Sequence, residues 1–194
     1  MAISNEEILE VFKRTGGVLH GHFLLTSGRH SDTYMQCAKL FVHPKDSERL
    51  CGELSKKLTE FKPDAVVSPA VGGIIMGYEV ARQLGVVNFF AERQDGKMTL
   101  RRGFEIEKGM RVIVVEDVVT TGGSVKEVIE LVKAAGAEVV AVASIVDRSG
   151  GKVDFGYPYR ALLSMEVVSY EADECPLCKE GKIPAVKPGS RGLK

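Results

Sequence analysis

The sequence predicts an α/β fold with a doubly wound, mainly parallel central sheet flanked by helices. Two observations carry this prediction. Short runs of Val, Ile and Ala alternate along most of the chain with apolar residues at helical spacing, and such alternation is typical of parallel sheets. The strongest run, at 112–115, is apolar throughout, as expected of a strand buried on both faces.

The first part of the chain precedes this alternation. Apolar residues share one face of a helix at 3–12, for which Ser4 or Asn5 can serve as the N-cap. Strands are predicted at 18–27 and 33–36, with a polar turn between them. These two strands are expected to form a hairpin.

The alternation begins at Pro44, which opens an amphipathic helix that reaches toward Pro63. The later elements predicted are, in chain order, a strand at 65–68, a helix at 73–84, strands at 86–91 and 111–116, a helix at 124–135 and a strand at 138–147. The section 92–109 interrupts the pattern with many charges and internal glycines. It is expected to be a solvated loop or a mobile two-stranded flap, and long polar loops in compact domains are often functional.

The composition limits the domain count and the class of protein. The chain has 194 residues, 44% of them hydrophobic, which suits one core and is too little for two ordinary domains. We expect a single domain at 1–170 and a C-terminal tail at 171–194. Lys plus Arg equals Asp plus Glu, 26 each, so no excess positive charge favours nucleic-acid binding.

The sequence also predicts the compartment. Charged residues among the first 15 fit an amphipathic helix and not a signal peptide. No uncharged apolar run approaches the roughly 18 residues of a membrane span. The protein is expected to be cytoplasmic, with its four cysteines reduced.

The most informative motif follows the apolar run at 112–115. Glu116 and Asp117 end the strand, and a turn rich in hydroxyls and glycine then leads into the next helix. The first amides of a helix have no internal partner and can hold a phosphate at the ligand-binding end of the sheet. Two acids beside that cradle suit a ligand whose hydroxyls or metal lie near its phosphate, such as a ribose 5-phosphate.

A structural interpretation of the same residues stays open. The acids can simply end a strand, the turn can be only a turn, and Ser124 can be a helix N-cap. The Walker A and dinucleotide-binding patterns are both missing from this stretch. A second strand end, after Val67, gives either another anion cradle or a tight turn, formed by Ala70, Val71, Gly72 and Gly73.

The stretch 112–124 resembles the phosphoribosyl pyrophosphate (PRPP) motif of type I phosphoribosyltransferases. Its surroundings resemble the orotate phosphoribosyltransferases of that family: residues 23–34 are similar to the Ser-Gly-x-x-Ser segment that forms a hood over the base, at about 1–40. The family's orotate-binding arginine falls on Arg148, and its mobile basic loop on 92–109. The structural alternative is that Arg148 forms only a surface ion pair with Asp147. In the same way, the basic loop can be only a solvated surface.

The resemblance implies a role for each matching residue. Catalytic roles fall on Glu116, Asp117 and Lys97, and orotate binding on Thr120 and Arg148. The pyrophosphate loop is the second strand end. PRPP binding is implied for Arg93, Lys97, Glu116, Asp117, Val118, Val119, Thr120, Thr121, Gly122, Gly123 and Ser124. The chain departs from some members at Gly72 and Thr26, where they have lysine, and its loop has no histidine.

The implied reaction joins orotate to the ribose 5-phosphate of PRPP, giving orotidine 5-phosphate and pyrophosphate in de novo pyrimidine (UMP) synthesis. Mg²⁺ would be carried by PRPP, with no metal ligand assigned to the protein, and a homodimer would share the loop between subunits. Two alternatives stay open: salvage of a purine or uracil by the same chemistry, and a PRPP-sensing regulator on the same fold.

The C-x-x-C pair at Cys175 and Cys178 is compatible with half of a four-thiolate zinc site. A full site is expected to need Cys37 and Cys51, or a second subunit. The four histidines have no ligand spacing that stands out.

Overall fold

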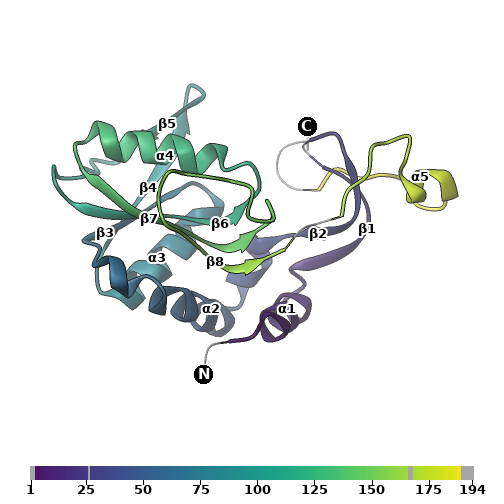
Figure 1. Cartoon of the computed structure of the whole chain (residues 1–194), viewed down its shortest axis with the longest axis horizontal. Helices are drawn as coiled ribbons and strands as arrows, with labels where there is room; N and C mark the ends of the chain where they lie inside the picture. Colours follow the sequence, from purple (N-terminus) through teal and green to yellow (C-terminus); the bar gives the residue numbers. More distant parts are fainter. Residues whose placement is uncertain (1–2, 26, 166–167, 189–194) are drawn as a thin grey trace.

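The computed structural model describes residues 3–25, 27–165 and 168–188. Its central sheet has the strand order β5-β4-β3-β6-β7-β8 (Figure 1). Neighbouring strands pair in parallel except for β4 and β5, which are antiparallel. The strands are β3 (Ala65–Pro69), β4 (Val87–Gln94), β5 (Lys97–Leu100), β6 (Arg111–Val119), β7 (Glu138–Asp147) and β8 (Tyr159–Ser164). The predicted doubly wound, mainly parallel sheet is confirmed.

Helices cover both faces of the sheet. Figure 1 shows α2 (Pro44–Lys56) and α3 (Gly72–Leu84) on one face and α4 (Gly123–Ala134) on the other. Alternate residues of β6 divide between the two layers: Ile113 belongs to the apolar cluster of α2 and α3, and Val114 to that of α4. The apolar run therefore reflects a strand buried on both sides.

The hood lies beside the sheet. It contains α1 (Asn5–Arg14), β1 (Val18–Leu24), β2 (His30–Met35) and the 3₁₀ helix η1 (Cys37–Val42). Ser4 caps α1 in a reciprocal capping box with Glu7, as the sequence predicted for its N-cap. Strands β1 and β2 pair antiparallel. Phe12, fully buried, anchors α1 in the same cluster as α2 and α3.

Some boundaries differ from the predicted ones. The helix expected to reach Pro63 ends at Lys56, and a short 3₁₀ turn, η2 (Thr59–Phe61), follows it. Gly122, and not Ser124, is the N-cap of α4. Strand β8 and the helix α5 (Pro176–Glu180) were not predicted. Thr26, whose replacement of a lysine was noted above, lies outside the described residues.

The segment expected as a tail folds back onto the hood. Tyr170 forms an antiparallel bridge with His30, and Val186 forms a parallel bridge with Phe23. The C-terminal segment therefore extends the hairpin on both sides through backbone hydrogen bonds. Among the described residues, no helix has the length and apolar character needed to cross a membrane.

Candidate active site

The acid pair lies at the carboxyl end of β6. Asp117 is buried, at 8% exposure, and Glu116 is partly buried. Burial raises the pKa of both carboxyls, and for Glu116 the neighbouring Asp117 raises it further. The Val118 amide donates to Asp117 Oδ1 at 2.9 Å, which holds the side chain in place. To ionise in so little water, these two acids need a partner that offsets their charge.

The second predicted cradle lies against this pair. A Cβ added at Gly72 would be 2.9 Å from both carboxylate oxygens of Asp117, and one at Gly73 would be 3.2 Å from Glu116 Oε1. A side chain at either position would force the acids or the loop to shift, so glycine permits this close approach. The structure brings the two predicted strand ends together.

Helix α4 presents open amides beside the acid pair. Gly122 precedes it in the left-handed region, at φ 74°, and Lys126 makes the first backbone bond of the helix, to Gly122 O. No side chain of the described residues caps this end, and its first turn holds no acid. Thr120 and Thr121 are exposed at the same place. Open donors at a helix N-terminus are suited to holding an anion.

Helix α3 begins in a similar way. It starts at Gly72, separated by two residues from the end of β3, and within the described chain no side chain caps it. Because Gly72 lies against Asp117, this second helix start also faces the acid pair. The carboxyl ends of these strands therefore offer two sets of open amides beside two carboxylates. This layout suits a ligand with two anionic groups.

Arg148 lies at the end of the strand next to β6. It follows β7, and its amide donates to Val119 O at 2.8 Å. Its Nε is buried without a hydrogen-bond partner in the described part of the chain, and burial lowers its pKa. Asp147 accepts instead from the amides of Ser149 and Gly151, at 2.8 and 3.0 Å. The guanidinium has a free donor that an anionic ligand can take.

Tyr34, in β2, completes this corner of the site and was assigned no role from the sequence. Arg148 Cζ lies 5.6 Å from the centre of its ring. Burial raises the pKa of Tyr34, and Asp117 contributes in the same direction. Its place at the end of the stretch 23–34 is the signal that could have identified it. The hood thus reaches the strand ends through Tyr34.

The section 92–109 includes an antiparallel hairpin formed by β4 and β5. Its residues do not join the strand-end site of their own chain. Arg93 forms a two-pronged ion pair with Glu127 of α4, at 2.9 and 2.6 Å, and also donates to Gly96 O. Lys97 is exposed at the start of β5. Figure 1 shows the tip of the hairpin rising past α4, away from the hood.

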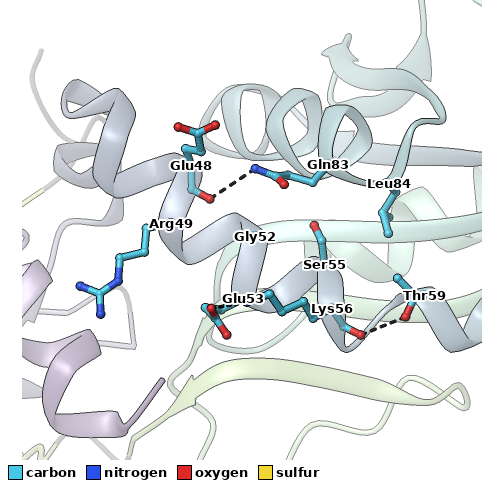
Figure 2. Close-up of a pocket in the computed structure, with 9 residues that line it drawn as sticks. All are labelled: Glu48, Arg49, Gly52, Glu53, Ser55, Lys56, Thr59, Gln83 and Leu84. Atoms are coloured by element: carbon cyan, nitrogen blue, oxygen red, sulfur yellow. Dashed lines mark hydrogen bonds and ion pairs between the residues drawn. The ribbon is translucent and has the colours of Figure 1, made fainter. Parts of the chain in front are cut away.

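A hollow between α2 and α3 is unrelated to these residues. Figure 2 shows its lining side chains, which include Ser55, Lys56 and Gln83. It lies by the C-terminal ends of both helices, and because α3 runs back from the strand ends, its last residues lie at the opposite edge of the sheet. Arg82 already pairs with Glu48 there. The hollow is a surface groove away from the acids.

Cys37 and Cys51 do not join Cys175 and Cys178, so within one chain they do not complete a four-thiolate set. Both are buried among the apolar residues of α2, α3 and the sheet. Burial raises the pKa of the Cys37 and Cys51 thiols. They serve as apolar core residues.

Comparison with known proteins gives a consistent result. The family model described as "Phosphoribosyl transferase domain" matches residues 41–174. An orotate phosphoribosyltransferase of Caldanaerobacter subterraneus subsp. tengcongensis is 59% identical over 191 residues, covering 98% of this chain and 100% of the relative. The orotate phosphoribosyltransferase structure from Aeropyrum pernix has a TM-score of 0.70 at 27% identity, covering 81% of this chain and 93% of that one. The one from Mycobacterium tuberculosis H37Rv, in complex with Fe(III) dicitrate, has a TM-score of 0.68 at 30% identity, covering 83% and 96%.

Proposed function

The chain belongs to the phosphoribosyltransferase family, and we propose that it transfers the ribose 5-phosphate of PRPP to orotate. The products are orotidine 5-phosphate and pyrophosphate, in the de novo synthesis of UMP. The observation that carries the choice of acceptor is Arg148, a half-buried residue after β7 whose Nε has no hydrogen-bond partner among the described residues. Arginine grips a carboxylate with two parallel hydrogen bonds, and orotate carries a carboxylate.

The donor would lie across the two helix starts. The amides and hydroxyls of residues 120–124 would bind the 5-phosphate, because they form an uncapped helix N-terminus. Glu116 and Asp117 would accept hydrogen bonds from the ribose hydroxyls. As pyrophosphate leaves C1, the ribose ring gains positive charge, which two fixed carboxylates favour. Positioning and electrostatics then supply most of the catalysis.

The diphosphate would bind at the loop formed by residues 70–73, where α3 begins. The fit to Mg²⁺ rests on the donor set: the carboxylate oxygens of Asp117 lie against Gly72, and Mg²⁺ prefers oxygen ligands. When bound, the ion neutralises charge on the leaving diphosphate. Gly72 supplies no positive charge of its own, so the neutralisation falls to Mg²⁺ and to residues outside this loop.

Arg93 and Lys97 would supply that charge to the site of a neighbouring subunit. Their hairpin projects away from the hood, and Arg93 is already paired with Glu127 of its own chain. A cytoplasmic homodimer that exchanges these hairpins would place a cationic, water-excluding cover over each bound PRPP.

Orotate would lie between the hood and the strand ends. Its carboxylate would pair with Arg148 and its ring would lie near Tyr34, with Thr120 as a further donor. The nucleophilic nitrogen of orotate can arrive deprotonated, so no protein general base is required.

A single assay tests the acceptor. Pyrophosphate release from Mg-PRPP is measured with orotate, uracil, hypoxanthine, xanthine or adenine supplied in turn. Release with orotate alone is the expected result. Release with a purine or uracil instead would assign the chain to salvage, and release with none of the five would favour a binding protein on the same fold.

A further inference from the structure

Two cysteines and two histidines converge at one point of the hood. Their ligand atoms all lie within 4.8 Å of one another: His22, His30, Cys175 and Cys178. His22 Nε2 is 3.6 Å from the Sγ of each cysteine and 2.7 Å from His30 Nδ1. Cys178 Sγ is 3.3 Å from His30 Nδ1. Four such ligand types in so small a volume match the Cys₂His₂ set of structural zinc sites.

The four residues come from three separate elements. His22 lies in β1, His30 opens β2, and the cysteines lie at the start of α5 and within it. Two of the ligands follow C-x₂-C spacing, the usual arrangement for one half of a zinc site. The other half is contributed by neighbouring strands of the hairpin, which explains why no local spacing of the histidines indicated it.

The hydrogen bond of His22 orients its lone pair toward the cluster. Its Nδ1 lies 2.8 Å from the carbonyl oxygen of Ile183. A carbonyl can only accept, so Nδ1 carries the proton and Nε2 presents a lone pair to the two sulfurs. Metal-binding histidines typically have their second nitrogen fixed in this way.

The distances from His22 to the two sulfurs fit a tetrahedral ion, and the widest separation in the set, 4.8 Å, has to close by about an ångström. With Zn–N near 2.0 Å and Zn–S near 2.3 Å, nitrogen and sulfur ligands lie about 3.5 Å apart. The two distances of 3.6 Å from His22 to sulfur agree with this value. The two imidazole nitrogens, 2.7 Å apart, need to separate by about half an ångström to reach the corresponding spacing.

We propose that His22, His30, Cys175 and Cys178 bind one Zn²⁺ as a closed structural site. The soft thiolates favour zinc over Mg²⁺, which prefers oxygen ligands. All four positions are filled by protein, so no place is left for a substrate or a reactive water. Binding replaces the protons of the two thiols with the metal ion, and the proton that His30 Nδ1 shares with the lone pair of His22 moves to the other nitrogen of the His30 ring. This site is separate from the proposed transferase chemistry and does not depend on it.

The ion would fasten the C-terminal segment to the hood. That segment already bonds to both hood strands, through His30 with Tyr170 and Leu24 with Val186. Arg29 adds bonds to Ser169 and pairs with Glu171. Zinc would hold the C-terminal segment and the hairpin together. A hairpin of two strands alone is only marginally stable.

Metal content of the purified full-length protein tests the proposal. Elemental analysis should find one zinc per chain after dialysis against metal-free buffer. In the Cys175→Ser/Cys178→Ser and His22→Ala variants the zinc content should fall at least tenfold. His20→Ala is the matched control, because His20 is exposed on the same strand, and it should keep its zinc. Cys51→Ala controls for the loss of a cysteine elsewhere.

A second measurement keeps the test independent of how the variants fold. Wild-type protein stripped with a chelator is titrated with Co²⁺, and a tetrahedral thiolate site gives intense visible bands that Zn²⁺ then removes. Stripping should also lower the apparent Tm of the wild type, with no change in the double cysteine variant. Failure of the stripped wild type to bind Co²⁺ or Zn²⁺, or equal zinc content in the double cysteine variant, would overturn the proposal. A Cys175–Cys178 disulfide found by mass spectrometry under reducing purification would also count against it.

Discussion

Two adjacent carboxylates at the end of β6 are held where their charge is unfavourable. Their pKa values are raised by burial, so in the folded protein both give up their protons less readily than in the unfolded chain. For a carboxyl with a raised pKa, stability is highest at low pH and falls as pH rises from the unfolded value of about 4 toward the folded value. Such a pair does not stabilise the core of the protein. It is explained by a bound ligand whose hydroxyls or metal ion interact with the two carboxylates.

Replacing Asp117 with Asn should therefore separate stability from activity. Turnover should fall well over tenfold, because the proposed contact to the ribose is lost. The ligand-free variant should nevertheless unfold at a higher temperature at pH 7, by about 2–4 °C for each kcal/mol of relief. Thermal unfolding between pH 5 and pH 8 should show a shallower loss of stability than in the wild type.

Glu10→Gln is the matched control for this prediction, since Glu10 is an exposed acid paired with Lys13 on α1. It should leave both turnover and the pH dependence of unfolding unchanged. Wild-type kinetics in the Asp117→Asn protein would remove the acid from the proposed mechanism.

Arg148 allows a different prediction, because the role proposed for it concerns only one of the two substrates. Arg148→Ala should raise the KM for orotate by about 10- to 100-fold, the loss expected for charge-assisted hydrogen bonds, with a much smaller effect on the KM for PRPP. Steady-state kinetics with each substrate varied in turn measures both values.

Arg160→Ala provides the comparison for Arg148. Arg160 also stacks on an aromatic ring, 5.3 Å from the centre of Phe61, and pairs with Glu60. It belongs to β8 and has no contact with the acid pair. The Arg160→Ala variant should keep both KM values. This result would show that the loss of an arginine stacked on an aromatic ring does not by itself change KM. Equal losses for orotate and PRPP in Arg148→Ala would argue against a carboxylate contact.

Among the elements, the hairpin of β4 and β5 is the one whose proposed role depends on a neighbouring subunit. The ion pair between Arg93 and Glu127 holds it against α4. The Lys97 side chain is exposed and makes no hydrogen bond or ion pair with the described residues. A hairpin with these properties can serve another subunit without changing the core of its own.

Mixing two inactive variants tests this arrangement. Lys97→Ala and Asp117→Asn should each have low activity alone. In a dimer that shares hairpins, mixed dimers contain one site with both residues intact, so refolding an equal mixture should recover about a quarter of wild-type activity. Recovery no greater than the sum of the two variants would place Lys97 at the site of its own chain or in no site at all.

The elements also show where sequence patterns suffice. The apolar run with its two acids predicted both the buried strand and the cradle, because burial on two faces and an uncapped helix start are local properties. The hairpin was left open between loop and flap, although Asp95 and Gly96 both have positive φ, as expected of an Asp-Gly turn between two strands. That dipeptide was the available signal.

Across the whole molecule, the contacts that could not be predicted are those between distant residues. His22 and Ile183 are separated by 161 positions, and nothing near either one indicates the other. The approach of Gly72 to Asp117 and of Tyr34 to Arg148 likewise depends on how the sheet assembles. A resemblance to a family supplied some of these neighbours, but the partner histidines of the C-x-x-C pair came only from the structure.

The bridges of the C-terminal segment to both hood strands also bear on the order of folding. During synthesis the hood hairpin emerges long before Tyr170 and Val186, the residues that complete it. Contacts so far apart in sequence form slowly. The region made first is therefore finished last, and until then its strand edges stay open to unwanted pairing. A nascent chain stalled before Tyr170 would carry a folded sheet with an incomplete hood.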